Sequence, residues 1–235
     1  MIKIRKEKYE GFSLVEMLIT IAIMGTVMII SSTVLSTLIR VSTVASNKIR
    51  ARNESEFVLE LLRRTIRNSD PSDVYVFRSH VPEGVSPGRS YDSENDVVKG
   101  EVDDAVYING LPENEVGNEI QFRPYGFSNW LCLGFFRDIN DPEKGYILWT
   151  SGYDLRDNHE TCFAPDNPSS YLMLLNSDYI NIKDFGISYM ESADGNYIIT
   201  FDILSEPMNW YLGPRSIINR EVYRKGVVST EGIVW

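Results

Sequence analysis

The sequence predicts an α+β protein in which a long N-terminal helix is followed by a head built on an antiparallel β-sheet. An apolar stretch at 12–39 is long enough for a membrane helix. A helical period then continues to Asn68, and the remainder contains several short runs with the alternation typical of strands. These patterns divide the chain into segments 1–11, 12–39, 40–69 and 70–235.

The apolar stretch at 12–39 contains a single charged residue, Glu16. Its 28 residues would extend about 42 Å as an α-helix, whereas the hydrocarbon core of a bilayer is about 30 Å thick. An ionisable residue in such a span costs about 2.5–3.5 kcal/mol, so it usually marks a functional site with a partner. We therefore expect Glu16 to have a specific role.

The segment 1–11 carries four basic and two acidic residues, which predicts that it stays in the cytoplasm and that the head is extracytoplasmic. Four further basic residues follow the span and weaken this orientation signal: Arg40, Lys48, Arg50 and Arg52. Two alternatives are a signal peptide cleaved near Ala45 and a plain signal anchor. The span is too long for an ordinary signal peptide, and its internal carboxylate suits neither alternative.

Segment 40–69 is predicted to continue the helix in amphipathic form. Apolar residues recur at steps of three and four, with most charges between them. Asn68, Ser69, Asp70 and Pro71 should end the helix, because the residue before a proline is pushed out of the α region. We expect the apolar stripe of this segment to pack on the head.

The head contains about 165 residues, enough for one sizeable core. Its best hairpin joins the last two long runs across Ala193, Asp194 and Gly195. Segment 80–117, rich in Gly, Pro, Asp and Glu, is predicted to be a surface insertion with one short strand. The predicted strands are Val74–Arg78, Val106–Asn109, Glu119–Pro124, Leu131–Arg137, Gly145–Thr150, Ile180–Met190, Tyr197–Leu204 and Glu221–Ser229.

Residues 11–25 read GFSLVEMLITIAIMG. This run resembles the prepilin N-terminus of type IV pilins and type II secretion pseudopilins. The resemblance implies cleavage after Gly11 by a prepilin peptidase, methylation of the new N-terminus at Phe12, and an assembly role for Glu16. It also implies the pilin-like lollipop fold, in which 1–11 is a leader peptide and 12–39 forms the filament core.

Elementary chemistry supplies a reason for each part of the motif. Glycine has no side chain, so the backbone at Gly11 can enter a narrow peptidase cleft. Cleavage would leave a cationic amine four residues from Glu16, or about 6 Å along a helix. Methylation keeps that amine charged. A buried charge pair contributes more to register than to net stability, so we expect Glu16 to align the subunit with the N-terminus of a neighbour.

Finer features favour a minor pilin or a J-type minor pseudopilin. The head is large, and Thr33 occupies the place where major pilins of the family often have a helix-breaking proline. The resemblance implies several partners: prepilin peptidase, other pilins or pseudopilins, the inner-membrane assembly platform and membrane lipid. The protein would be a single-pass cytoplasmic membrane protein, later carried in a pilus or pseudopilus at the cell surface. The alternatives are a monomeric membrane-anchored binding or adhesion module and a minor pilin of DNA uptake.

The chain has two cysteines, Cys132 and Cys162, which we expect to form a disulfide if the head is exported. With His80 and His159 they form a nominal zinc set, but their spacing does not suit zinc. Two acidic clusters have spacings that calcium can use, although neither completes an EF-hand. These candidate calcium ligands are Asp92, Glu94 and Asp96, and Asp138 and Asp141 with Asn140. No cofactor is predicted.

The sequence predicts no enzyme, since the tract around His159 offers a nucleophile and a base with nothing to orient them. The net charge is −10, and loss of the leader would make it −12 because that segment has four basic and two acidic residues. Such a protein repels phosphate backbones, so nucleic acid is an unlikely partner. A local basic patch at Arg215, Arg220, Arg224 and Lys225 is the only feature that favours DNA.

Overall fold

The computed structural model describes residues 11–78, 89–99, 116–153, 163, 172–193, 195–208 and 221–230. The chain divides into two compact units, Met1–Ser46 and Asn47–Trp235. One helix, α1 (Leu14–Arg67), contributes residues to both units: Leu14–Ser46 to the first and Asn47–Arg67 to the second. The two units are described separately below.

In the first unit, α1 displays its apolar side chains on every side. Ile21, Met28 and Leu35 are all more than half exposed. The threonine hydroxyls of this unit donate to backbone carbonyls one turn earlier, as in the contacts of Thr26 with Ile23 and of Thr33 with Ile30. Such bonds lower the cost of placing a hydroxyl in an apolar environment.

In the second unit, α1 buries one stripe against the head. The buried residues recur at steps of three and four, which places them on one face of a helix. They are Ala51, Ser55, Val58, Leu59, Leu62 and Ile66. The hydroxyl of Ser69 donates to the Thr65 carbonyl where the helix ends. This half of α1 is therefore a core element of the head.

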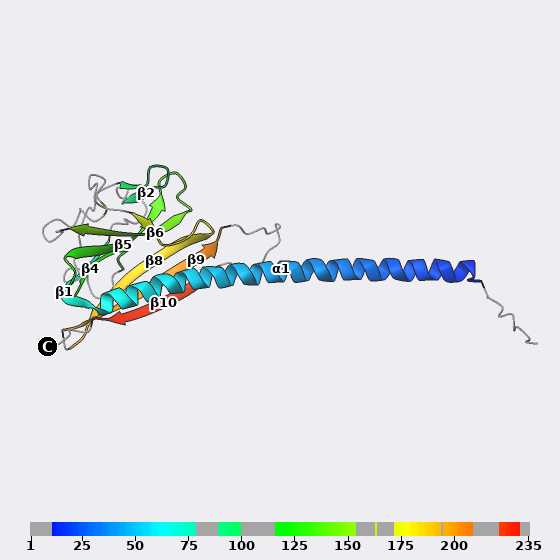
Figure 1. Ribbon diagram of the computed structural model, residues 1–235, viewed down its shortest axis with the longest axis horizontal. Helices are drawn as coiled ribbons and strands as arrows, with labels where there is room; N and C mark the ends of the chain where they lie inside the picture. Colours follow the sequence, from blue (N-terminus) through cyan, green and yellow to red (C-terminus); the bar gives the residue numbers. More distant parts are fainter. Residues whose placement is uncertain are drawn as a thin grey trace, which may run out of the picture. The chain divides into compact units, whose positions relative to one another are not determined.

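A three-stranded antiparallel sheet has the order β10-β9-β8 and forms one wall of the core. Its strands are β8 (Ile180–Glu191), β9 (Tyr197–Pro207) and β10 (Val222–Ser229). These strands lie beside the head segment of α1 in Figure 1. Gly226 faces the helix so closely that an added Cβ would lie 2.6 Å from Leu59 Cδ2. The β8–β9 turn contains Gly195 at φ 76°, a conformation that favours glycine.

A second sheet of seven strands lies on the other side of the core. Strands β1, β4, β5 and β6 pair antiparallel in that order, and β7 pairs with β6. The hairpin β2–β3 joins β5 through a parallel pairing, so this sheet is mixed. The strands are β1 (Ser69–Phe77), β2 (Ser90–Asp92), β3 (Val97–Lys99), β4 (Glu119–Pro124), β5 (Asn129–Asp138), β6 (Gly145–Tyr153) and β7 (Met173–Leu174).

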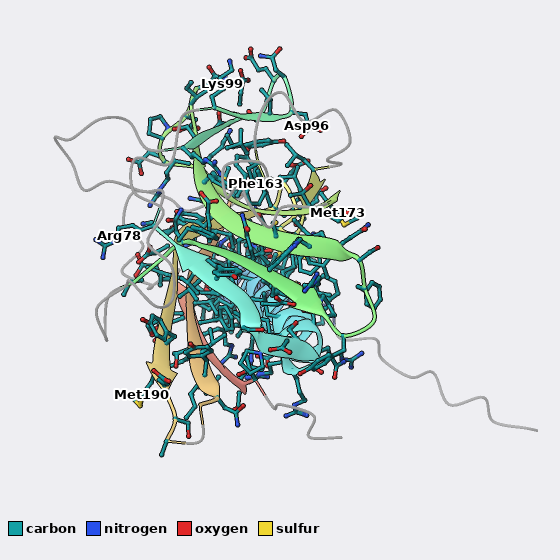
Figure 2. All side chains as sticks on the ribbon, turned by 90° about the vertical axis from the view of Figure 1, so that its left-hand side faces the viewer. Arg78, Asp96, Lys99, Phe163, Met173 and Met190 are labelled. Atoms are coloured by element: carbon teal, nitrogen blue, oxygen red, sulfur yellow. The ribbon has the colours of Figure 1, made fainter. Side chains whose placement is uncertain are left out.

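The main core lies between α1 and the inner faces of both sheets. A smaller aromatic cluster contains Trp130, Phe136 and Phe163, with the rings of Phe136 and Phe163 4.9 Å apart edge to face. Figure 2 places Phe163 against the strands of the mixed sheet. Because Trp130 and Phe136 alternate with the core residues Leu133 and Phe135 along β5, the two clusters lie on opposite faces of that strand.

The structure confirms the predicted α+β class, with one long N-terminal helix and a β-rich head. The helix was predicted to end near Asn68 and ends at Arg67. The prediction for 80–117 was incomplete, since β2 and β3 form a hairpin there, and β7 was not predicted. The pairings of the named strands are antiparallel except that β2 runs parallel to β5. The predicted strand Val106–Asn109 lies outside the described residues.

Candidate functional site at the N-terminal helix

The predicted cleavage site lies just before the start of α1. Gly11 and Phe12 precede the first helical residue, Leu14, and Phe12 is 72% exposed. A Cβ built on Gly11 would meet no atom within 4 Å. Any preference for glycine at this position therefore comes from a contact outside this chain, such as a processing enzyme.

Glu16 and Ser13 form a capping box at the start of α1. The Ser13 backbone N–H donates to Glu16 Oε2 over 3.2 Å, and the Val15 N–H donates to Ser13 Oγ over 3.4 Å. These bonds satisfy backbone donors that the first turn of a helix leaves free. Glu16 thus has a structural role that our sequence analysis missed, although the spacing Ser-x-x-Glu signals it.

The carboxylate of Glu16 is held on the first turn of an exposed apolar helix. Within the described part of the chain, α1 is the one helix long and apolar enough to cross a membrane, with a mean hydropathy of 2.2 over its most apolar window. None of that window is buried by the rest of the protein. Within its own chain, the Glu16 carboxylate accepts the Ser13 N–H of the cap. The described residues do not cover the apolar window of α1, so only lipid or the helices of other chains could surround it.

Cys132 lies in β5, is fully buried, and is disulfide-bonded. The sequence contains one other cysteine, Cys162, which lies outside the described residues. The pairing of Cys132 with Cys162 stays a prediction. His80 and His159 also lie outside the described residues, as do Arg215 and Arg220 of the candidate DNA patch.

The acidic cluster at 92–96 forms the turn of the β2–β3 hairpin. Asp92 Oδ1 accepts the N–H groups of Glu94 and Asn95, while Oδ2 accepts Lys99 Nζ at 2.5 Å. The hydrogen bond from Lys99 is the main reason that the pKa of Asp92 falls to about 2. Asp96, at φ 54°, accepts the Tyr91 hydroxyl at 2.7 Å. Figure 2 shows Asp96 and Lys99 at this hairpin.

The second acidic cluster lies next to the hairpin because β2 pairs with β5. Ser93 donates to Asp138 Oδ2 at 2.6 Å, and the Asn140 N–H donates to Asp138 Oδ1. Asp141 forms an ion pair with Lys144 at 3.5 Å. These carboxylates bond to protein donors, and the described residues contain no group of three His, Cys, Asp or Glu side chains suited to a metal ion. Asp92 and Asp138 therefore stabilise the β2–β3 hairpin and the turn after β5 through these hydrogen bonds.

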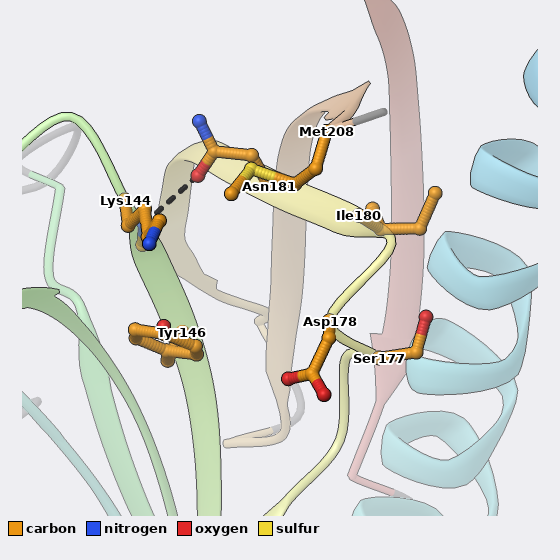
Figure 3. Close-up of a pocket in the computed structure, with 8 residues that line it drawn as sticks. Lys144, Tyr146, Ser177, Asp178, Ile180, Asn181 and Met208 are labelled. Carbon is orange, nitrogen blue, oxygen red and sulfur yellow. Dashed lines mark hydrogen bonds between the residues drawn. The ribbon is translucent and has the colours of Figure 1, made fainter. Parts of the chain in front are cut away.

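A small hollow of about 180 Å³ lies where the start of β6 meets the start of β8. Figure 3 shows Lys144, Tyr146, Asp178 and Asn181 around it, with Asn181 Oδ1 accepting the Gly145 N–H at 2.9 Å. Ser177, also in the lining, donates its hydroxyl to Glu54 Oε1 at 2.7 Å. The Ser177 hydroxyl is thus bound to a residue of α1 in a structural contact.

These features define a class of protein: an α+β head whose first helix extends from an exposed apolar segment that is long and apolar enough to cross a membrane. The family model for the prokaryotic N-terminal methylation motif matches residues 8–32, which include Gly11, Phe12 and Glu16. This match supports membership of the type IV pilin and pseudopilin family. No curated protein matches the chain, and no solved structure matches it.

Proposed function

We propose that this protein is a minor pilin or a J-type minor pseudopilin, cleaved after Gly11, methylated at Phe12 and assembled into a filament. The observation that carries the proposal is the methylation motif at 8–32, which extends into the part of α1 whose apolar side chains are exposed among the residues that the structure describes. Lateral packing against other such helices would remove this surface from water. The partners would be prepilin peptidase, other pilins and the inner-membrane assembly platform.

Processing is tested by replacing the glycine at the cut site. Gly11→Leu should leave the precursor uncut, because a bulky side chain does not fit a peptidase cleft shaped for glycine. The folded chain should tolerate the change, since position 11 contacts nothing within 4 Å. Gly25→Leu is the matched control, because Gly25 also contacts nothing within 4 Å and lies inside the helix. Intact mass from native membranes reports both variants.

The assembly role of Glu16 is tested separately from its capping role. Glutamine at N3 preserves a capping box, whereas alanine removes it. If the charge pairs with the N-terminus of a neighbour, Glu16→Gln and Glu16→Ala should both prevent incorporation into filaments. If only the cap matters, Glu16→Gln should assemble like the native protein. Immunogold labelling of sheared filaments provides the measurement.

The same experiment separates this function from a monomeric membrane-anchored binding module. A monomeric module needs no amine–carboxylate pair and enters no filament, so the native protein and both Glu16 variants would be found in the membrane fraction alike. A native protein that stays in the membrane fraction and never enters filaments would also favour the anchored module.

A further inference from the structure

The charges of the chain are divided sharply along its length. Residues 40–53 contain four basic residues and no acidic one, whereas residues 54–235 contain 15 basic and 30 acidic residues. Three of the four basic residues belong to the head unit: Lys48, Arg50 and Arg52. We call these three residues the basic collar.

The basic collar is left available for an outside partner. Lys48 and Arg52 have no carboxylate within 4.0 Å in the part of the chain that the structure describes, and Arg52 is exposed. Arg50 pairs with Glu54 at 3.5 Å but keeps 51% of its side chain exposed. Further along the same helix, Arg63 and Arg64 both pair with Glu60. Within the described residues, Lys48 and Arg52 therefore lie near the start of the head unit without an ion pair, as does Arg67 at the far end of the helix.

An aromatic side chain lies beside the basic collar. The Arg50 guanidinium carbon is 4.1 Å from the centroid of the Tyr179 ring, and Tyr179 is 49% exposed. Such a cation–π contact holds both groups in place at the surface. Tyrosine is enriched at the interface between a membrane and water, where its ring lies at the headgroup level.

The collar surrounds the helix and does not form a stripe along it. Lys48 and Arg52 are four residues apart and share one side, while Arg50 is about 200° from Lys48. A neighbouring protein packed along α1 would be best matched by charges on one side. A flat surface crossed by the helix is better matched by charges on both sides. The arrangement therefore favours a membrane surface over a second copy of the chain.

The connection to the apolar span keeps the collar near the membrane. Nine to thirteen residue steps separate Ile39, the last residue of the apolar stretch, from Lys48 and Arg52, the first and last residues of the collar. They correspond to about 14–20 Å as a helix and cannot exceed about 47 Å when fully extended. An anionic surface would attract the collar and repel the acidic remainder of the head, which orients the head above the bilayer.

We propose that the basic collar binds the headgroups of anionic phospholipids while the subunit is held in the membrane. The contact would place Lys48, Arg50 and Arg52 near lipid phosphates, with Tyr179 at the headgroup level. This role is independent of cleavage and filament assembly, and it applies to the membrane pool of the subunit.

The test uses the full chain, one copy per nanodisc, in phosphatidylcholine alone or with about 30% phosphatidylglycerol. An amine-reactive acetylating reagent labels Lys48, and Lys144 at the β5–β6 turn is the internal reference. We expect the ratio of the Lys48 labelling rate to the Lys144 labelling rate to be about threefold lower in anionic discs than in neutral discs. Salt at about 0.5 M should make the two ratios equal, because it screens the attraction between the collar and the lipid. Equal ratios in the two lipids would overturn the proposal.

Two variants sharpen the result. Arg50→Gln with Arg52→Gln should abolish most of the lipid-dependent protection of Lys48, while Arg63→Gln with Arg64→Gln, an equal change of charge farther along α1, should preserve it. Unchanged Lys48 labelling in neutral discs shows that each variant is folded. If Lys48 were protected from acetylation only in discs that hold two copies of the chain, and equally in both lipids, the collar would bind a second copy. That result would contradict the lipid contact.

Discussion

The two parts of α1 have the same backbone and opposite surroundings. Between Leu14 and Ser46, apolar side chains such as Met28 and Leu35 are exposed on all sides. Between Asn47 and Arg67, the apolar residues form one stripe, and Leu62 and Ile66 in that stripe are fully buried. The first part thus leaves its apolar side chains exposed within the described residues, while the second part completes the core of the head.

The largest effect should come from deleting a side chain of the buried stripe. Leu62→Ala should lower the free energy of unfolding of the head by about 2–5 kcal/mol, because it leaves a cavity in a packed core. Leu35→Ala is the matched control, since Leu35 lies in the first unit and is 59% exposed. Denaturant unfolding in detergent, followed by near-UV circular dichroism, measures both. Equal losses for the two variants would break the comparison.

A change in the opposite direction, from small to large, tests how tightly the helix packs on the three-stranded sheet. Gly226→Ala should destabilise the head by about 1–3 kcal/mol, because the new Cβ would lie 2.6 Å from Leu59 Cδ2. Gly25→Ala, in the exposed part of α1, should cost nothing. Combining Gly226→Ala with Leu59→Ala should recover part of the loss. Purely additive effects of the pair would contradict direct contact.

A buried polar contact between helix and sheet should contribute less. Ser55 Oγ lies 3.0 Å from Ser205 Oγ, and both residues are almost fully buried. A double-mutant cycle with Ser55→Ala and Ser205→Ala should give a coupling of about 1 kcal/mol. A coupling near zero would mean that the hydroxyls do not hold α1 on β9.

The smallest effect should lie far from α1, in the β2–β3 hairpin. The pKa of Asp92 is lowered to about 2 in the folded protein, mainly by the hydrogen bond from Lys99. A lowered pKa stabilises the fold above the unfolded value near 4 and loses that stabilisation as the pH falls from about 4 to 2. Asp92→Asn should flatten this part of the stability profile. Denaturant midpoints across that range should then fall less steeply with acid than those of the native protein.

Sequence periodicity captured the long elements because each carries enough residues to show its pattern. The helix and β4, predicted as Glu119–Pro124, were placed within two residues of their observed bounds. Strands β2, β3 and β7 were missed because two or three residues show no period, and their pairing with β5 and β6 depends on distant parts of the chain. The first strand was predicted to start at Val74, yet β1 begins at Ser69 across an irregular register.

The site was predictable where its residues are adjacent in sequence. Gly11, Phe12 and Glu16 lie within six residues, so the motif is visible without a fold. The link between Glu54 and Ser177 joins residues 123 positions apart, and no local pattern predicts it. The cation–π pair of Arg50 with Tyr179 was hidden for the same reason.

The central claim is that the exposed part of α1 becomes a filament core after processing. The most direct test is the N-terminus of the protein purified from its native membranes, by intact mass and terminal-peptide sequencing. Our account predicts a chain that begins at N-methyl-Phe12. A chain that keeps Met1, or one cut near Ala45, would contradict it.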